Sequence, residues 1–166
     1  MPIGDAVGRW LAQDLIALRD QPWADLSAMD GYAVRAAEHP GPWRVTGEST
    51  AGGATPAPLS AGGALRIFTG APMPPGADAI LIQENATRDG DLLMASADPL
   101  PVGRHIRARA SDFARETLLL DSGARLGAAQ VALAVLGGHG RVAVHRRPRV
   151  ALLSTGNELV PPGADT

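Results

Sequence analysis

An aspartate stands in a short turn within the first fifth of the chain. Residues 27–33 read Ser-Ala-Met-Asp-Gly-Tyr-Ala, so Asp30 precedes Gly31 and lies between Met29 and Tyr32. Asp-Gly pairs favour tight turns because both residues tolerate the left-handed backbone region. The pattern therefore predicts a carboxylate at the tip of a turn, between two large anchoring side chains. These residues alone favour a solvated Asp that starts a hairpin over a residue of a functional site.

A second segment with candidate chemistry ends the apolar run 64–69. Thr69 and Gly70 close this run and lead into the Pro-rich loop 72–76. Proline fixes its own φ angle, so such a loop can hold the Thr69 hydroxyl and the following amides still. Hydroxyl and amide donors suit oxyanions, but a threonine that merely caps a strand end explains Thr69 equally well.

A third segment with candidate chemistry follows the apolar run Arg149–Leu153. This run is typical of a strand in a parallel sheet that is covered on both faces, and it leads into Ser-Thr-Gly-Asn-Glu at 154–158. A buried strand that ends in a small, hydroxyl-rich Gly turn is how an α/β sheet begins a ligand site, and its amides suit phosphate or another oxyanion. Because one strand cannot form a sheet, we expect the sequence to be the front part of a longer protein.

The composition excludes several classes of chemistry. The 166 residues are 45% hydrophobic and 19% charged, with a net charge of −2, so no global field would recruit nucleic acid or an anionic membrane. The chain has no Cys and no Lys, which excludes disulfides, thiolate chemistry and a lysine nucleophile. The longest apolar run, 130–137, is far shorter than the roughly 20 residues of a membrane span. With no signal-peptide pattern, the expected location is the cytoplasm.

The apolar patterns predict two helical segments and several short strands. Apolar residues at helical spacing predict a helix over Ile3–Leu18, with Leu15–Leu18 as an alternative short strand. The Ala-rich run Leu126–Leu136 predicts a helix that is buried on more than one side and ends at Gly137-Gly138. In the part from about 25 to 104, short strands separated by Gly- and Pro-rich connections indicate a small sandwich or barrel. The predicted strands are 43–46, 64–69, 79–84, 91–94, 141–145 and 149–153.

Three motifs in a fixed order link this sequence to a known family. They are Ser27–Ala33, Arg66–Ala79 and Pro148–Leu159. Together they resemble the MoeA family of molybdopterin molybdenumtransferases, whose animal relative is the gephyrin E domain, and the resemblance spans essentially the whole chain. It implies an α+β, multi-domain fold. The implied parts are a helical linking domain at 1–24 and 105–147, a small β-rich barrel or sandwich domain at 25–104 inserted in it, and the truncated start of an α/β molybdopterin-binding domain at 148–166.

The resemblance also implies an enzyme of molybdenum cofactor biosynthesis. Family members insert molybdate into adenylylated molybdopterin and release AMP, with a divalent cation, usually Mg²⁺. They are elongated homodimers, for which molybdopterin adenylyltransferase and molybdoenzyme assembly proteins are the expected partners. A non-catalytic scaffold with the same fold and dimer interface, or a ligand-binding relative that has lost turnover, stays open as an alternative. Because it would lack most of the pterin-binding domain, the 166-residue chain is expected to be inactive alone.

Carried over position by position, the resemblance implies two groups of site residues. The catalytic group is Asp30, Thr69 and Asp112, and the substrate-binding group is Thr155, Gly156 and Glu158. The turn that carries Asp30 is expected to line a cleft between subunits and to face the pterin-binding domain. No metal ligand is assigned.

Two of these residues keep a structural alternative. Asp112 belongs to a family segment that usually reads Gly-Glu-Asp, whereas this chain has Ala110 and Ser111 before it. The lost acid and the lost Gly count against a paired-carboxylate role, and an Asp that bonds backbone amides in a turn is the favoured alternative. Glu158 would alternatively begin a helix, where the dipole favours an acid. Positive charge for an oxyanion is expected from Arg66, Arg104, Arg107 or Arg109.

Overall fold

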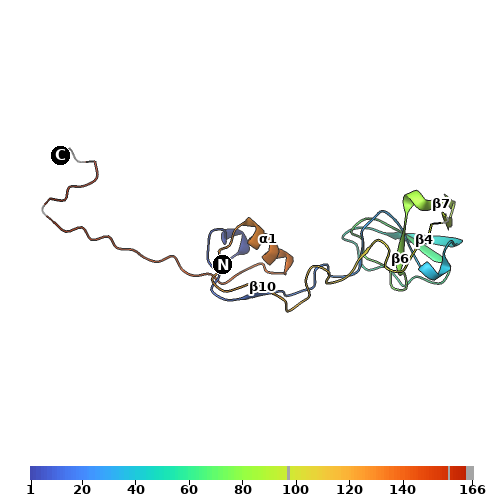
Figure 1. Cartoon of the computed structure of the whole chain (residues 1–166), viewed down its shortest axis with the longest axis horizontal. Coiled ribbons are helices and arrows are strands. Elements are labelled where there is room, and N and C mark those ends of the chain that lie inside the picture. Colours follow the sequence, from blue (N-terminus) through green and yellow to red (C-terminus); the bar gives the residue numbers. More distant parts are fainter. Residues whose placement is uncertain (97, 157, 164–166) are drawn as a thin grey trace.

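The computed structural model describes residues 1–96, 98–156 and 158–163. This part of the chain is mostly β, with one α-helix, α1 (Ala128–Leu136). Figure 1 shows a group of strands joined by paired extended segments to a second group that contains α1. Within the described residues, no helix is both long and apolar enough to cross a membrane.

The larger sheet has six strands in the order β6-β3-β5-β4-β8-β7. The pair β4–β5 is parallel, and the other pairs are antiparallel. Four of the strands confirm those predicted from the sequence, whereas β3 and β7 were not predicted. The strands are β3 (Gly31–Val34), β4 (Trp43–Ser49), β5 (Gly63–Ile67), β6 (Ala79–Ile82), β7 (Ala86–Asp89) and β8 (Leu92–Ala95).

Strand β3 is buried on both faces of this sheet, because successive side chains of a strand point to opposite sides. Tyr32 and Val34 join a core cluster that includes Trp43 on one face. Ala33 joins a second cluster that includes Ile67 on the other face. A strand enclosed in this way has a fixed register, since a slip of one residue would exchange its two faces. This register also fixes the residue that immediately precedes β3.

Two short ladders connect the sheet to the part that contains α1. Strand β2 (Leu26–Ser27) pairs with β9 (Ile106–Arg107), and β1 (Leu15–Ile16) pairs with β10 (Leu118–Leu120). The chain therefore leaves and re-enters this part as paired antiparallel segments (Figure 1). Around α1 a third cluster is built from Ala6, Leu11, Leu15, Leu126, Ala134 and Val142. Three 3₁₀ turns complete the elements: η1 (Ile3–Asp5), η2 (Ala36–Glu38) and η3 (Gln83–Asn85).

The predicted helix over Ile3–Leu18 is wrong. Only η1 is helical there, and the Leu11 amide donates to the carbonyl of Ala124 at 2.9 Å, so the segment pairs with a distant part of the chain. Val7 and Trp10 are 58% and 53% exposed, which means that the helical spacing of apolar residues does not mark a buried face. The alternative of a short strand near Leu15 is confirmed as β1.

The helix predicted over Leu126–Leu136 is confirmed as α1, but it is not buried on several sides. Ala134 is its buried residue, whereas Val135 and Leu136 are 47% and 43% exposed. Gly138 follows it with φ of 96°, the left-handed conformation that closes many helices.

The last two predicted strands are wrong within the described residues. The segment 141–145 makes isolated bridges at Arg141 and Val144 but no strand. Residues 149–153 also form no strand, and Leu152 is 92% exposed. An apolar run adopts a buried strand only where neighbouring strands bond its backbone, and 149–153 has no such neighbour in the described part of the chain.

Candidate functional site

The side chain of Asp30 bonds the loop that follows β5. Its Oδ1 accepts hydrogen bonds from the Thr69 amide at 2.7 Å and from the Thr69 hydroxyl at 2.9 Å. Asp30 immediately precedes β3, and Thr69 lies two residues beyond β5, which is the neighbour of β3 in the sheet. Two residues that the sequence places in separate motifs therefore meet at one end of adjacent strands. We call Asp30, Thr69, Arg66 and Gln83 the Asp30 cluster.

Backbone bonds around Ser27 hold these two loops together. The Ser27 amide donates to the carbonyl of Ala71 at 2.9 Å, and the Gly70 amide donates back to the carbonyl of Ser27 at 2.8 Å. The Ser27 side chain is 2% exposed, and its hydroxyl accepts from the Met29 amide at 3.3 Å. The 27–30 turn is thus fixed from both sides, so the position of the Asp30 carboxylate is set by the fold.

Gly31 is required for a reason other than the one predicted from the Asp-Gly pair. Neither Asp30 nor Gly31 has a positive φ. Gly31 already belongs to β3, and a Cβ built on it would lie 2.1 Å from the carbonyl oxygen of Leu81 on β6. The expectation of a left-handed turn is therefore wrong. Glycine is needed here because the backbones of β3 and β6 approach too closely for any side chain.

Arg66 is the one of the four candidate arginines that lies beside Asp30. Its Nη1 donates to the Gly31 carbonyl at 3.0 Å, and its Nη2 donates to Oε1 of Gln83 at 2.8 Å. The guanidinium carbon lies 5.1 Å from the Tyr32 ring centre and 4.9 Å from that of Phe68. The backbone amide of Gln83, a residue that the sequence did not single out, donates to the Asp30 carbonyl at 3.2 Å. The available signal for Gln83 was its position as a polar residue directly after β6, the strand that pairs with β3.

The other three candidate arginines are engaged elsewhere. Arg104 donates from Nε to Nε2 of His105 at 3.1 Å. Arg107 pairs with Asp112, and Arg109 pairs with Asp20. None of these pairs includes a residue of the Asp30 cluster.

Among the described residues, Asp112 makes no hydrogen bond or ion pair with the Asp30 cluster. Its carboxylate bonds Arg107, and its amide donates to the carbonyl of Gln21 at 2.9 Å, nine residues before Asp30. Ala110 has φ of 60°, a conformation that favours glycine. The backbone therefore keeps the shape that suits the family's Gly, although this chain carries Ala there at a cost of roughly 1–3 kcal/mol.

The predicted substrate-binding residues also lie apart from the Asp30 cluster. Thr155, Gly156 and Glu158 are exposed, and Figure 1 shows the segment that carries them leading away from the α1 group on the side opposite the large sheet. The Leu159 amide donates to the Gly156 carbonyl at 3.2 Å, which makes a turn. Asn157 lies outside the described residues. The hydrogen bonds of the described residues therefore join Asp30 to Thr69 but to none of the remaining predicted site residues.

The surroundings of Asp30 favour its charged form. Hydrogen bonds from the Thr69 amide and then the Thr69 hydroxyl hold the pKa of the Asp30 carboxyl below its usual range, and the Arg66 charge acts in the same direction. Partial desolvation opposes this lowering of the pKa. Among the described residues, no donor bonds Oδ2 of Asp30, so an ionised oxygen is open to a ligand.

We expect the bond between Thr69 and Asp30 to depend on pH with a defined sign. A carboxyl whose pKa is lowered by folding contributes stability above its unfolded pKa of about 4, and that contribution is lost as the pH falls through the folded pKa. In an NMR titration, the Thr69 amide shift should therefore change with a midpoint below about pH 4. Thr69→Val removes the hydroxyl bond and should move the midpoint upward. A wild-type midpoint at or above the ordinary value would contradict the bonding described here.

A metal ion would find one ligand in this cluster rather than a complete site. Within the described residues, no group of three or more His, Cys, Asp or Glu side chains converges on one point. Mg²⁺ commonly takes one or two carboxylates and completes its shell with water and substrate phosphates. Oδ2 of Asp30 fits the role of such a single carboxylate ligand.

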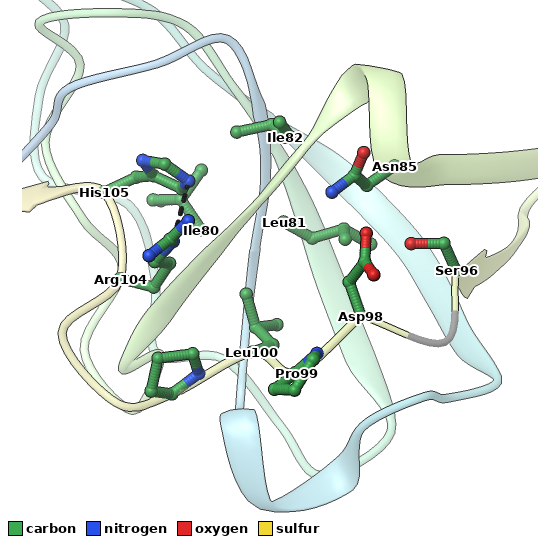
Figure 2. A pocket seen from close by; sticks show the side chains of 11 residues that line it. Ile80, Leu81, Ile82, Asn85, Ser96, Asp98, Pro99, Leu100, Arg104 and His105 are labelled. Carbon is green, nitrogen blue, oxygen red and sulfur yellow. Dashed lines mark hydrogen bonds between the residues drawn. The ribbon is translucent and has the colours of Figure 1, made fainter.

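A separate hollow of about 450 Å³ lies beside β6, an edge strand of the sheet (Figure 2). Figure 2 shows Leu81 and Leu100 between Arg104 and His105 on one side and Asp98 on the other. Burial and the Arg104 charge lower the pKa of His105, which keeps its ring neutral at pH 7. Arg104, one of the four candidate arginines, lines this hollow, whereas none of the described catalytic or substrate-binding residues predicted from the sequence does.

Comparison with known proteins gives consistent matches along the chain. The model of a family described as "MoeA N-terminal region (domain I and II)" matches residues 1–138. A molybdopterin molybdenumtransferase of Nostoc sp. is 40% identical over 162 residues, which cover 93% of this chain and 37% of the relative. The molybdopterin molybdenumtransferase of Synechococcus elongatus is 37% identical over 169 residues, which cover 97% of this chain and 42% of the relative.

A solved structure matches the fold as well. The crystal structure of a molybdopterin biosynthesis MoeA protein from Pyrococcus horikosii gives a TM-score of 0.92 at 36% identity, over 99% of this chain and 44% of that one. The chain thus spans about two fifths of the length of the curated relatives it matches.

Proposed function

Since the chain belongs to the family of MoeA N-terminal regions, we propose that it forms part of a molybdopterin molybdenumtransferase. The proposed reaction inserts molybdate into adenylylated molybdopterin and releases AMP. The observation that carries the proposal is the bonding of Asp30 to Thr69, because it joins two separate motifs into one partly exposed, negatively charged group.

Within this chain, Asp30 and Thr69 are proposed as catalytic residues. Thr69 occupies one oxygen of the Asp30 carboxylate, which fixes its orientation and keeps it ionised at neutral pH. The second oxygen is then free to bind a cation or to accept a proton. Mg²⁺ bound there would neutralise charge on the adenylate phosphate. Preorganised groups of this kind act without reorganisation during the reaction.

We propose that the remaining predicted site residues act together with Asp30 in a dimer of two copies of the chain. Thr155, Gly156 and Glu158, proposed as substrate-binding residues, lie on a segment that leads away from the part containing Asp30. Asp112, proposed as a catalytic residue, bonds Arg107 and Gln21 rather than Asp30. A homodimer would allow residues of one subunit to complete the Asp30 site of the other. We include in this proposal the multi-domain organisation, with a linking part at 1–24 and 105–147, a β-rich part at 25–104 and a pterin-binding part from 148.

The proposed setting is the cytoplasm. Molybdopterin adenylyltransferase is the proposed partner that delivers the adenylylated substrate, and molybdoenzyme assembly proteins are proposed to receive the product. No observation on this chain favours the scaffold alternative.

A chimeric enzyme tests the proposed function. This chain would replace the matching 37% of the Nostoc transferase, and molybdate-dependent cofactor formation would be measured with adenylylated molybdopterin. We expect kcat/KM within about tenfold of the parent, a loss of no more than about 1.4 kcal/mol of transition-state stabilisation. The unmodified parent and the chain alone serve as controls. A folded, dimeric chimera that forms no cofactor would overturn the proposal.

A further inference from the structure

Three neighbouring strands of the sheet meet at the Asp30 cluster. Asp30 lies directly before β3, Gln83 directly after β6, and Arg66 near the end of β5. These strands are adjacent in the order β6-β3-β5. Asp30 thus lies at the point where the ends of three strands have to be held together.

Arg66 makes contact with the residues around Asp30 from several directions. It faces Tyr32 directly across the β3–β5 pair, and its guanidinium lies over the rings of both Tyr32 and Phe68. One of its terminal nitrogens donates to the Gly31 carbonyl, and the other donates to Gln83. Gln83 in turn bonds the Asp30 backbone. The planar guanidinium is suited to this arrangement because it can donate two directed hydrogen bonds while stacking on rings.

We propose that Arg66 is a positioning residue, which fixes Asp30 in the orientation that leaves Oδ2 open. It does so by bonding the two strand ends that flank Asp30 while its guanidinium packs on two aromatic rings. The inference rests on the role of Asp30 in the proposed function. The positioning itself is a property of this chain and is measured separately.

The expected effect of Arg66→Lys depends on whether Arg66 acts through its positive charge alone or by positioning Asp30. If Arg66 acted only through its charge, a lysine would replace it, since it carries the same charge on a flexible stem. Lysine cannot donate the same fork or stack as a plane. Two further acids, Glu48 opposite Arg66 on β4 and Glu84 beside Gln83, are unchanged by the substitution. Arg66→Lys therefore separates the two explanations.

The test compares Arg66→Lys, Arg66→Gln and Phe68→Leu in the 166-residue chain by NMR titration of the Thr69 amide. Arg66→Lys and Arg66→Gln should both weaken the acid dissociation of Asp30 by about threefold to tenfold, a rise of up to about one pH unit in the midpoint. Phe68→Leu keeps the arginine but removes one ring, and should produce a smaller rise. Arg44→Gln is the matched control, because Arg44 is an exposed arginine on β4 of the same sheet.

The possible results distinguish a positioning role of Arg66, an effect of its charge alone, and no role at all. A wild-type midpoint in Arg66→Lys would overturn positioning and leave only charge. An unchanged midpoint in both Arg66→Gln and Phe68→Leu would overturn any role for Arg66, and the second variant decides the matter if the first does not fold. In the chimeric enzyme, Arg66→Lys should lower kcat with little change in KM. If the midpoints rise as expected but kcat of the chimeric enzyme is unchanged, the proposed role of Asp30 in the reaction is contradicted. The positioning of Asp30 by Arg66 is then still supported.

Discussion

Replacing Asp30 by asparagine in the chimeric transferase is expected to lower kcat/KM for molybdate insertion by at least about a hundredfold, the usual size of effect for an essential charged group in a site. Asparagine has the same shape, and its oxygen can still accept both hydrogen bonds from Thr69. It loses the negative charge on the open oxygen, and so the ability to hold a cation or accept a proton. The chain should therefore fold as before and lose only its chemistry.

An aspartate outside the cluster provides the control for this substitution. Asp121 is exposed and directly follows β10, and Asp121→Asn should leave the rate unchanged. Circular dichroism and gel filtration would show whether Asp30→Asn keeps its fold and assembly. Activity near the wild-type rate in a folded Asp30→Asn enzyme would remove Asp30 from the catalytic residues.

The sequence singled out residues of the Asp30 cluster but not how they are arranged. Asp30 and Thr69 were both singled out, but nothing in the chain order shows that β3 and β5 are neighbours, so their contact could not be derived. Arg66 was one of four candidate arginines, and only the strand register shows which of them faces Tyr32. Gln83 was missed because a polar residue after a strand is common and carries no motif of its own.

The fold was predictable where local pattern and tertiary structure agree. Short apolar runs between Gly and Pro predicted β4, β5, β6 and β8, because their turn chemistry is local. The predicted helix over Ile3–Leu18 was wrong for two reasons. Some of the apolar side chains that give the helical spacing are exposed, and the backbone bonds residues more than 100 positions away. Such long-range pairing leaves no periodic signal in a segment that forms isolated bridges.

Gly31→Ala is expected to be the most destabilising of the substitutions considered for this chain. The new Cβ would lie 2.1 Å from the Leu81 carbonyl oxygen, and the obstacle is backbone rather than the flexible end of a side chain. Strands β3 and β6 would have to separate where Gly31 pairs with Ile82. Overpacking of this kind costs about 3 kcal/mol. A domain of this size has only about 5–15 kcal/mol of stability in total, so the midpoint of urea unfolding should fall markedly.

Gly4→Ala separates this steric effect from the general cost of replacing glycine. A Cβ on Gly4 would meet no atom within 4 Å, and Gly4 has no positive φ, so alanine there should be neutral or stabilising by about 0.5–1 kcal/mol. Gly31→Ala should also weaken the Thr69 contact, because the Gly31 carbonyl accepts from Arg66 and the residue adjoins Asp30. Equal urea midpoints for the two variants would mean that β3 and β6 are not in close contact. A large loss confined to Gly31→Ala would show that one backbone approach supports both the sheet and the carboxylate beside it.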